Sequence, residues 1–338
     1  MPEQPRAGSR MLAGILTALI LAVAVIAGFG AWCIRMPGAS HRGDLPPADP
    51  ALAALRDRLS GHVAALAGEI GERNRDNRNK LDRAADYIEH QFSEMGYLAS
   101  PEVFGGEQFR NLVVDLYGRE LREEILVVGA HYDTTWFTPG ADDNASGVAG
   151  LLELARALKD RPLRRSVRLI AFVNEEDPFF GGDEMGSMVA AQRSYERGEN
   201  LVGMLSLEMI GFYSEEPGSQ RYPQPVRRFY PRVADFIGFV GNLRSRGLLH
   251  DAVREFRAAA QFPSEGLAAP EWLVPDIRRS DNYAYWRYGF RAIMVTDTSN
   301  FRNRNYHKTG DRPETLNYER MARVVAGLTE TIVALANH

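Results

Sequence analysis

Histidine and carboxylate side chains occur at four places in the sequence where an apolar run has just ended. The runs are ILVVGA, LIAFVN, MLSL and AIMVTD. The polar residues that follow them are His131, Asp133, Asp142, Asp143, Glu175, Glu176, Glu208 and His307. Several carboxylates do not share a dry cleft unless a cation neutralises them, and imidazole and carboxylate are good ligands for divalent metals. These residues therefore predict a metal site.

The single cysteine limits what that site can contain. Cys33 lies in an apolar N-terminal segment, so the chain forms no internal disulfide and a metal must be held by His, Asp or Glu. Two zinc ions fit such a ligand set. A carboxylate that bridges two metals about 3.5–4 Å apart is the arrangement of hydrolases that stabilise both the attacking and the departing oxygen.

Strand and helix patterns alternate around these groups. Strands are predicted at 111–118, 123–133, 166–176, 202–213 and 290–298, and helices at 80–97, at 145–160, after Gly182 and from Asn317. The strands are continuous apolar runs, which indicates burial on both faces. We therefore predict an α/β fold with a mixed, mostly parallel sheet and helices on both faces. Residues 214–280 interrupt this rhythm and are expected to elaborate the region near the site.

This fold explains why the polar groups follow strands. Ligands of open α/β sheets bind beyond the carboxyl ends of the strands. Four strand ends would bring both histidines and the acids to one edge of the sheet.

The N-terminal region predicts a membrane anchor. Residues 11–34 contain no charged residue and would form a helix of about 36 Å, whereas a bilayer core is about 30 Å thick. We expect a tail at 1–10, an uncleaved transmembrane helix at 11–34, a linker at 35–50 and a catalytic domain at 51–338, outside the cytoplasm. A cleaved signal remains the alternative. The net charge of −4 and pI near 6.0 argue against nucleic acid as a partner.

Five motifs, in order, resemble those of the M28 family of zinc exopeptidases, the aminopeptidase Y and leucyl aminopeptidase group. They are GAHYDTTWFTPGADDNASGVAGLLELAR, FVNEEDPFFGGDEMGS, LEMIG, SDNYAYWRYGF and RNYHKTGD, and the similarity extends from about Ile70 to the C-terminus. The resemblance implies a zinc exopeptidase-like fold and a peptide substrate with a free N-terminus.

The resemblance also implies a role for each site residue. One zinc would be held by His131 and Glu208, the other by Glu176 and His307, and Asp143 would bridge them. Glu175 would be the general base that takes a proton from the attacking water. Asp133 would accept the imidazole N–H of His131 and fix its tautomer. The Tyr306 hydroxyl would stabilise the oxyanion.

The sequence departs from the family pattern at two places. Many relatives have Asp where this chain has Glu208, so the number of zinc ions is less firmly implied than zinc itself. Ser280, Asp281 and Asn282 stand where relatives often have Ser-Asp-His, and we assign them no catalytic role.

Three functions are compatible with these motifs. The first is a metallo-aminopeptidase. The second is a glutaminyl cyclase with a single zinc, and the third is a scaffold that has lost the chemistry. The NEED motif and the tyrosine before His307 favour hydrolysis, and the full ligand set disfavours a scaffold.

Other polar and aromatic residues are expected to be structural. Asp142 and Asn144 are interpreted as cap and turn residues, and Tyr213, Phe212 and Trp286 as core or pocket residues. Surface-loop acids are expected at Asp177, Asp183 and Glu184. The histidines expected to be solvent-facing or packing residues are His41, His62, His90, His250 and His338.

Overall fold

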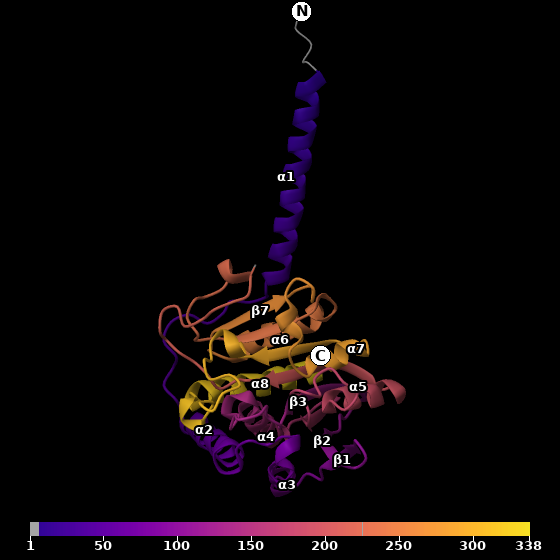
Figure 1. Cartoon of the computed structure of the whole chain (residues 1–338), viewed down its shortest axis with the longest axis vertical. Coiled ribbons are helices and arrows are strands. Elements are labelled where there is room, and N and C mark those ends of the chain that lie inside the picture. The colour runs from indigo at the N-terminus through magenta and orange to yellow at the C-terminus, as the bar shows by residue number, and fades with distance from the viewer. Residues whose placement is uncertain (1–6, 225) are drawn as a thin grey trace, which may run out of the picture. The chain divides into compact units, whose positions relative to one another are not determined.

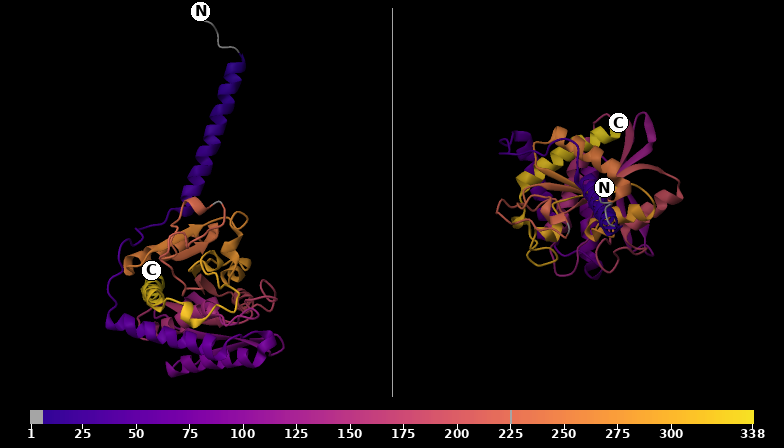
Figure 2. Two further views of the ribbon diagram at one scale, coloured as in Figure 1. Left: turned by 60° about the vertical axis from the view of Figure 1, so that its left-hand side comes forward. Right: turned by 90° about the horizontal axis from the view of Figure 1, so that it is seen from above.

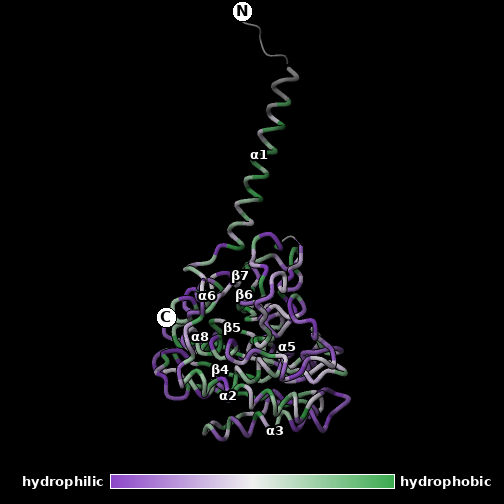
Figure 3. Tube along the Cα trace, turned by 90° about the vertical axis from the view of Figure 1, so that its left-hand side faces the viewer, coloured by the Kyte–Doolittle hydropathy of each residue, from purple (hydrophilic) through white to green (hydrophobic). Residues whose placement is uncertain are grey.

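The computed structural model describes residues 7–224 and 226–338, and it divides after Arg35 into a helical unit and a domain. The helix, α1 (Ala7–Ile34), includes four residues of the expected tail; residues 1–6 of that tail lie outside the described residues. Within α1, the segment Gly14–Ile34 has a mean hydropathy of 2.4 (Figure 1; Figure 3). This segment is long and apolar enough to cross a membrane. A signal sequence can have the same properties.

The domain is built on one eight-stranded sheet in the order β1-β2-β4-β3-β5-β8-β6-β7. Strands β4, β3, β5 and β8 are parallel to one another. β2 pairs antiparallel with both β1 and β4, β6 pairs antiparallel with β8, and β7 is parallel to β6. The predicted mixed, mostly parallel sheet is confirmed. The strands are β1 (Ser100–Phe104), β2 (Phe109–Leu116), β3 (Leu121–His131), β4 (Arg165–Phe172), β5 (Asn200–Glu208), β6 (Ile237–Gly241), β7 (Ser264–Ala268) and β8 (Ala292–Thr296).

Helices cover both faces of this sheet (Figure 1; Figure 2). One face packs against α4 (Gly147–Leu158), α6 (Arg246–Ala259) and α8 (Tyr318–Asn337), with α2 (Pro50–Val63) and α3 (Arg78–Glu94) completing that side. The other face packs against α5 (Gly186–Glu196) and α7 (Asn282–Arg287).

The central strand β3 shows why its sequence lacks alternation. Leu126 and Val128 belong to the apolar cluster under α4 and α8, whereas Ile125 and Val127 belong to the cluster under α5 and α7. A strand buried on both faces has apolar residues at successive positions.

Residues 214–280 do more than elaborate the site. They supply β6 and β7, which form one edge of the sheet, and the helix α6 between them in the sequence. Each of these two strands has only five residues, and glycines such as Gly238 and Gly266 interrupt their apolar pattern. A short strand with glycine gives a weak sequence signal.

The segment expected to be a linker has no regular secondary structure from Arg35 to Asp49, but it is attached to the domain. Arg257 of α6 donates hydrogen bonds to the carbonyl oxygens of Pro37 and Gly38, at 3.0 and 3.2 Å. Arg323 of α8 donates to the Pro46 carbonyl oxygen at 2.6 Å. This part of the chain therefore lies along the domain surface and does not act as a free spacer.

Candidate active site

The carboxyl ends of β3, β4, β5 and β8 deliver the predicted site residues to one edge of the sheet. His131 is the last residue of β3, Glu208 is the last residue of β5, and Glu175 and Glu176 follow β4 by a few residues. His307 lies in the loop after β8. The expected convergence of these side chains is therefore present.

His131, Asp143 and Glu208 form the first of two triads. Nε2 of His131 lies 3.5 Å from Oδ1 of Asp143 and 3.4 Å from Oε2 of Glu208. All three residues are buried. Their ligand atoms lie within 4.8 Å of one another, which is close enough to hold one ion.

Asp143, Glu176 and His307 form the second triad. Nε2 of His307 lies 3.1 Å from Oδ2 of Asp143 and 3.3 Å from Oε2 of Glu176. Asp143 therefore turns one carboxylate oxygen toward each histidine. This is the geometry of a carboxylate shared by two ion sites.

The donor atoms fit zinc. Ligands about 2.0–2.2 Å from a tetrahedral ion lie about 3.3–3.6 Å apart, and the histidine–carboxylate distances of 3.1–3.5 Å in the two triads are close to this. Neither ring nitrogen of His131 forms a hydrogen bond to any residue that the structure describes, although the ring is fully buried. The nearest carboxylates lie 3.4–3.8 Å from the ring nitrogens. A metal ion held between the ring and these acids would satisfy both.

Glu175 and Asp133 lie against the first triad. Oε2 of Glu175 is 3.8 Å from Nε2 of His131, and Oδ1 of Asp133 is 3.5 Å from Nδ1 of the same ring. Asp133 also accepts hydrogen bonds from the backbone N–H groups of Glu175 and Glu176, both at 3.1 Å. Asp133 thus ties the end of β3 to the end of β4, a contact that sequence reasoning did not anticipate.

Backbone groups near the bridging acid are held by a residue from a distant loop. The carboxylate of Asp311 accepts hydrogen bonds from the amides of Asp142 and Asp143, both at 3.0 Å. Asp311 belongs to the quoted motif RNYHKTGD, so the signal was present, but its target could not be seen without the fold.

Asn144 and Ser280 position Glu208. Asn144 donates to the Leu207 carbonyl oxygen at 2.8 Å and accepts from the Met209 amide at 3.0 Å, which fixes the backbone on both sides of Glu208. The Ser280 hydroxyl donates to Oε2 of Glu208 at 2.7 Å. Asn144 also accepts from the amide of Gly147 at the start of α4, so its expected capping role is only part of what it does.

Arg73 is a second feature that the sequence did not reveal. Its guanidinium is fully buried and donates to backbone carbonyl oxygens, among them those of Tyr132 at 2.6 Å and Gly140 at 2.9 Å. Burial lowers the pKa of Arg73 to about 10, and the nearby carboxylates, Asp133 first, oppose this shift. Arg73 therefore holds the loop between the two halves of the first motif.

The charges of the cluster perturb one another strongly. Burial raises the pKa of Glu175 well above its ordinary value and that of Glu176 to about 7. Burial opposes protonation of His131 and His307, but the carboxylates around each ring outweigh it, so the pKa of His131 is raised and that of His307 reaches about 10. Burial would raise the pKa of Asp143, but the two histidines hold it below its ordinary value. These shifts are typical of a functional site.

Tyr306 lies beside the second triad. Its ring stacks on His307 with the centroids 3.8 Å apart, and its hydroxyl accepts a hydrogen bond from Arg279 at 3.0 Å. Burial raises the pKa of the Tyr306 hydroxyl far above its ordinary value, so this group remains protonated and able to donate.

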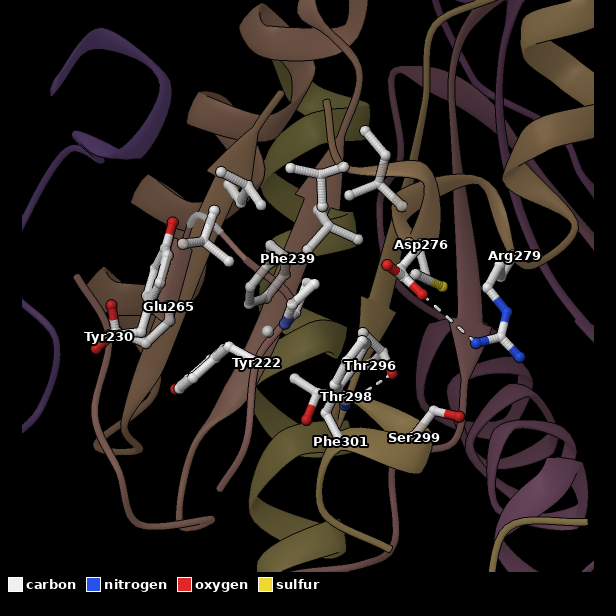
Figure 4. Close-up of a pocket in the computed structure, with 18 of the residues that line it drawn as sticks. Tyr222, Tyr230, Phe239, Glu265, Asp276, Arg279, Thr296, Thr298, Ser299 and Phe301 are labelled. Carbon is white, nitrogen blue, oxygen red and sulfur yellow. Dashed lines mark hydrogen bonds and ion pairs between the residues drawn. The ribbon is translucent and has the colours of Figure 1, made fainter. Parts of the chain in front are cut away.

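A cavity of about 100 Å³ adjoins the site, with Glu208 and Tyr306 among its lining residues. It lies over β6, β7 and β8, as Figure 4 shows. Apolar side chains line much of it: Val240, Leu267, Val274, Ile277 and Met294. Of the aromatic residues proposed for such a pocket, Tyr213 instead packs against Phe262, and the Trp286 indole donates to the Ala292 carbonyl oxygen.

The remaining polar residues lie outside the two triads. Asp142 is buried and accepts hydrogen bonds from the Gly211 amide and the Asn303 side chain, so it ties loops together and does not cap α4. Asp177, Asp183 and Glu184 are exposed, as expected. His62 packs with Tyr87 and Glu153. Asp281 is buried, and its carboxylate oxygens form no hydrogen bond with the described residues.

Comparison with known proteins agrees with the geometry. Peptidase family M28 matches residues 111–332, so the chain belongs to this family of peptidases. It is 41% identical over 290 residues to the uncharacterized protein YfbL of Escherichia coli strain K12, covering 81% of this chain and 87% of that protein. It is 27% identical over 239 residues to a probable zinc metalloprotease of Leptosphaeria maculans, covering 63% of this chain and 54% of that protein.

Solved structures share the fold at lower identity. The LapA aminopeptidase of Legionella pneumophila aligns with a TM-score of 0.66 and 18% identity, covering 88% of this chain and 78% of that one. The glutaminyl cyclase of Fimbriiglobus ruber aligns with a TM-score of 0.59 and 19% identity, covering 88% and 99%. At these identities the likeness shows the fold alone.

Proposed function

We propose that this M28 peptidase is a membrane-anchored aminopeptidase that uses two zinc ions to remove N-terminal residues from peptides. The observation that carries the proposal is the pair of triads that share Asp143, one oxygen toward each histidine. Glutaminyl cyclases use a single zinc, so a complete donor set for a second ion favours hydrolysis.

Five residues would hold the zinc ions: His131 and Glu208 on one side, Glu176 and His307 on the other, with Asp143 between them. The ions would supply Lewis-acid activation of the scissile carbonyl and of the attacking water. Glu175 would take a proton from that water and pass it to the departing amine. Asp133 holds the amides of Glu175 and Glu176 and would orient the His131 ring. The protonated Tyr306 hydroxyl would donate to the developing oxyanion.

The cavity beside the site would receive the side chain of the N-terminal residue. Its walls include Val240, Leu267 and Met294, so leucine, methionine and phenylalanine are the favoured residues. The acids of the site would bind the free amino group of the substrate. Because the cavity would hold one substrate side chain and the adjacent acids would bind the free amino group, the enzyme would remove one residue at a time.

Gly14–Ile34 would anchor the enzyme in a membrane, and the catalytic domain would lie outside the cytoplasm. Its length and mean hydropathy support a span. Alkaline extraction of cell membranes tests the anchor, because a spanning chain stays with the lipid whereas a cleaved chain is released.

Three measurements on the zinc-loaded protein test the catalytic proposal. We expect two zinc ions per chain by elemental analysis, hydrolysis of leucyl-arylamide substrates in preference to glutamyl ones, and no cyclisation of N-terminal glutamine. If the protein cyclised N-terminal glutamine and did not hydrolyse arylamides, the chain would instead be a glutaminyl cyclase. A peptide-library digest read by mass spectrometry would then define the preferred N-terminal residue.

A further inference from the structure

The chain directly after α1 is fixed to the strand β7. The Met36 side chain packs against Gly266, where an added Cβ would lie 2.7 Å from it. The amide of Ser264 donates to the Ser40 hydroxyl at 2.9 Å. α1 ends at Ile34, two residues before Met36 in the sequence.

A short exposed segment lies against the same strand. The Tyr230 hydroxyl donates to the carbonyl oxygen of Gly266 at 2.7 Å, so the residues before Tyr230 are neighbours of the Met36 contact. Figure 4 shows Tyr230 beside Glu265 of β7. Arg227, Arg228 and Phe229 are exposed, and 62% of Phe229 is accessible to solvent.

The charge of this segment differs from that of the whole chain. Residues 221–234 contain four arginines and no acidic residue, whereas the net charge of the chain is −4. The attached stretch 35–43 is also basic, with Arg35 and Arg42 and no acid. Arginine together with an exposed aromatic ring is the composition that binds the headgroup layer of an acidic membrane.

We propose that Arg227, Arg228 and Phe229 form a docking surface for an acidic phospholipid bilayer. The inference rests on the proposed membrane anchor. If Gly14–Ile34 spans the bilayer, the chain leaves the hydrocarbon core within two residues of Met36. The domain would then stay tethered to the bilayer through the short segment that follows Ile34.

The docking surface and the candidate substrate pocket share one segment. Val226 and Tyr230 flank the three docking residues and line the cavity that also contacts Glu208. Docking therefore brings the wall of that cavity to the lipid surface. The substrates that reach it most readily are peptides held at the same membrane.

The first experiment measures sedimentation of residues 36–338 with vesicles of phosphatidylglycerol and phosphatidylethanolamine. Both apolar clusters lie wholly within this domain, so it folds without α1. We expect binding to these vesicles and little binding to phosphatidylcholine alone. Arg227→Glu/Arg228→Glu should weaken binding about tenfold or more at low salt. Phe229→Ser should weaken it at high salt as well, because its contribution is apolar.

Matched control variants separate this surface from general effects of charge and exposed rings. Arg83→Glu/Arg119→Glu changes the net charge equally at exposed arginines elsewhere, and Tyr195→Ser removes a ring that is 63% exposed. Neither should change vesicle binding by more than about twofold. Zinc content and thermal unfolding of each variant confirm that it is folded.

The second experiment uses the full chain in proteoliposomes. With Cys33→Ser, an environment-sensitive fluorophore is attached at Gln224→Cys, an exposed position next to the docking residues, or, as control, at Tyr195→Cys. Headgroup-labelled quencher lipids should quench the probe at 224 but not the probe at 195. Equal quenching at both positions, or no sedimentation of the wild-type domain with acidic vesicles, would overturn the proposal. The surface would then be a candidate binding site for a protein partner. Release of the full chain by alkali would instead refute the anchor.

Discussion

A single buried acid on helix α4 and a buried cluster of acids next to that helix are neutralised in different ways. Glu153, on α4 itself, is paired within the chain: Arg58 lies at 2.7 Å, Arg156 at 3.1 Å and His62 at 3.2 Å. Asp143, in the turn before α4, faces two histidines and shares its surroundings with Glu175, Glu176 and Glu208. Glu153 is balanced by the protein's own cations, whereas the Asp143 cluster has more acid than the chain neutralises.

The comparison separates a structural network from a site. Arg58 and Arg156 donate to both oxygens of Glu153, so that carboxylate needs nothing further. Both ring nitrogens of His131 lack a hydrogen bond among the described residues, and so does Oε1 of Glu176. Buried polar atoms that lack a partner within the protein indicate a ligand that completes the group. The predictions below test this contrast.

Removing a histidine from the acidic cluster should have the largest effect. His131→Ala should lose metal and reduce kcat/KM at least about a thousandfold, because the first triad loses its only nitrogen donor. Elemental analysis and arylamide hydrolysis measure both effects. His62→Ala, which removes the buried histidine of the Glu153 network, should keep its zinc; equal metal loss in the two variants would contradict the contrast.

Replacing the proposed base should separate chemistry from metal binding. Glu175→Gln should lower kcat about 10²–10⁴-fold while zinc content stays at the wild-type value, because an amide cannot accept the proton. Glu184→Gln serves as the control, because Glu184 is an exposed acid in the same motif as Glu175. Full activity in Glu175→Gln would remove Glu175 from the mechanism.

Changing the residue that joins the ends of β3 and β4 should have an intermediate effect. Asp133→Asn replaces one acceptor oxygen by an NH₂ group that faces a backbone N–H, so metal affinity or kcat/KM should fall about 10–100-fold. Zinc titration and kinetics provide the measurement, with the exposed Asp183→Asn as control. An unchanged variant would show that neither the amides nor the His131 ring depends on this carboxylate.

Breaking the balanced network should change stability and leave catalysis intact. Glu153→Gln should lower the free energy of unfolding by about 1–2 kcal/mol, because it removes charge-assisted hydrogen bonds to Arg58 and Arg156. Urea unfolding measures this, and Glu330→Gln in the exposed pair with Arg161 should cost less. Loss of zinc from Glu153→Gln would contradict the separation of the Glu153 network from the Asp143 cluster.

The same network gives a pH dependence. Burial alone would raise the pKa of Glu153, but His62 and the arginines lower it to about 2 from an ordinary value of 4.5. A depressed folded-state pKa means that the stabilisation is present above about pH 4.5 and is lost as the pH falls toward about 2. The difference in free energy of unfolding between wild type and Glu153→Gln should therefore shrink as the pH falls across this range. A difference that stays constant would contradict this prediction.

The sequence predicted the sheet and the site where the signals were local. The apolar run 125–130 predicted a strand buried on both faces, and the residues directly after it and after β4 and β5 lie where parallel strands end. Glu208 and His307 were assigned as ligands because the ordered motifs resemble those of the M28 family. Whether these residues hold zinc, and how many ions, stays a prediction.

Other features depend on contacts that no local pattern encodes. Arg73 donates hydrogen bonds to backbone carbonyl oxygens more than fifty residues away in the sequence. A lone arginine in a polar stretch does not predict these contacts. Asp311 was inside a motif, yet its partners are the amides of Asp142 and Asp143. The stretch 35–50 has a linker composition, but Arg257 and Arg323 attach it to the domain.

Anomalous diffraction at the zinc absorption edge tests the central claim most directly. Crystals of residues 36–338 grown with zinc should show one peak among His131, Asp143 and Glu208 and a second among Asp143, Glu176 and His307. Data below the edge identify the metal, and both peaks should be missing there. A folded domain that shows no anomalous peak in either triad would contradict the account.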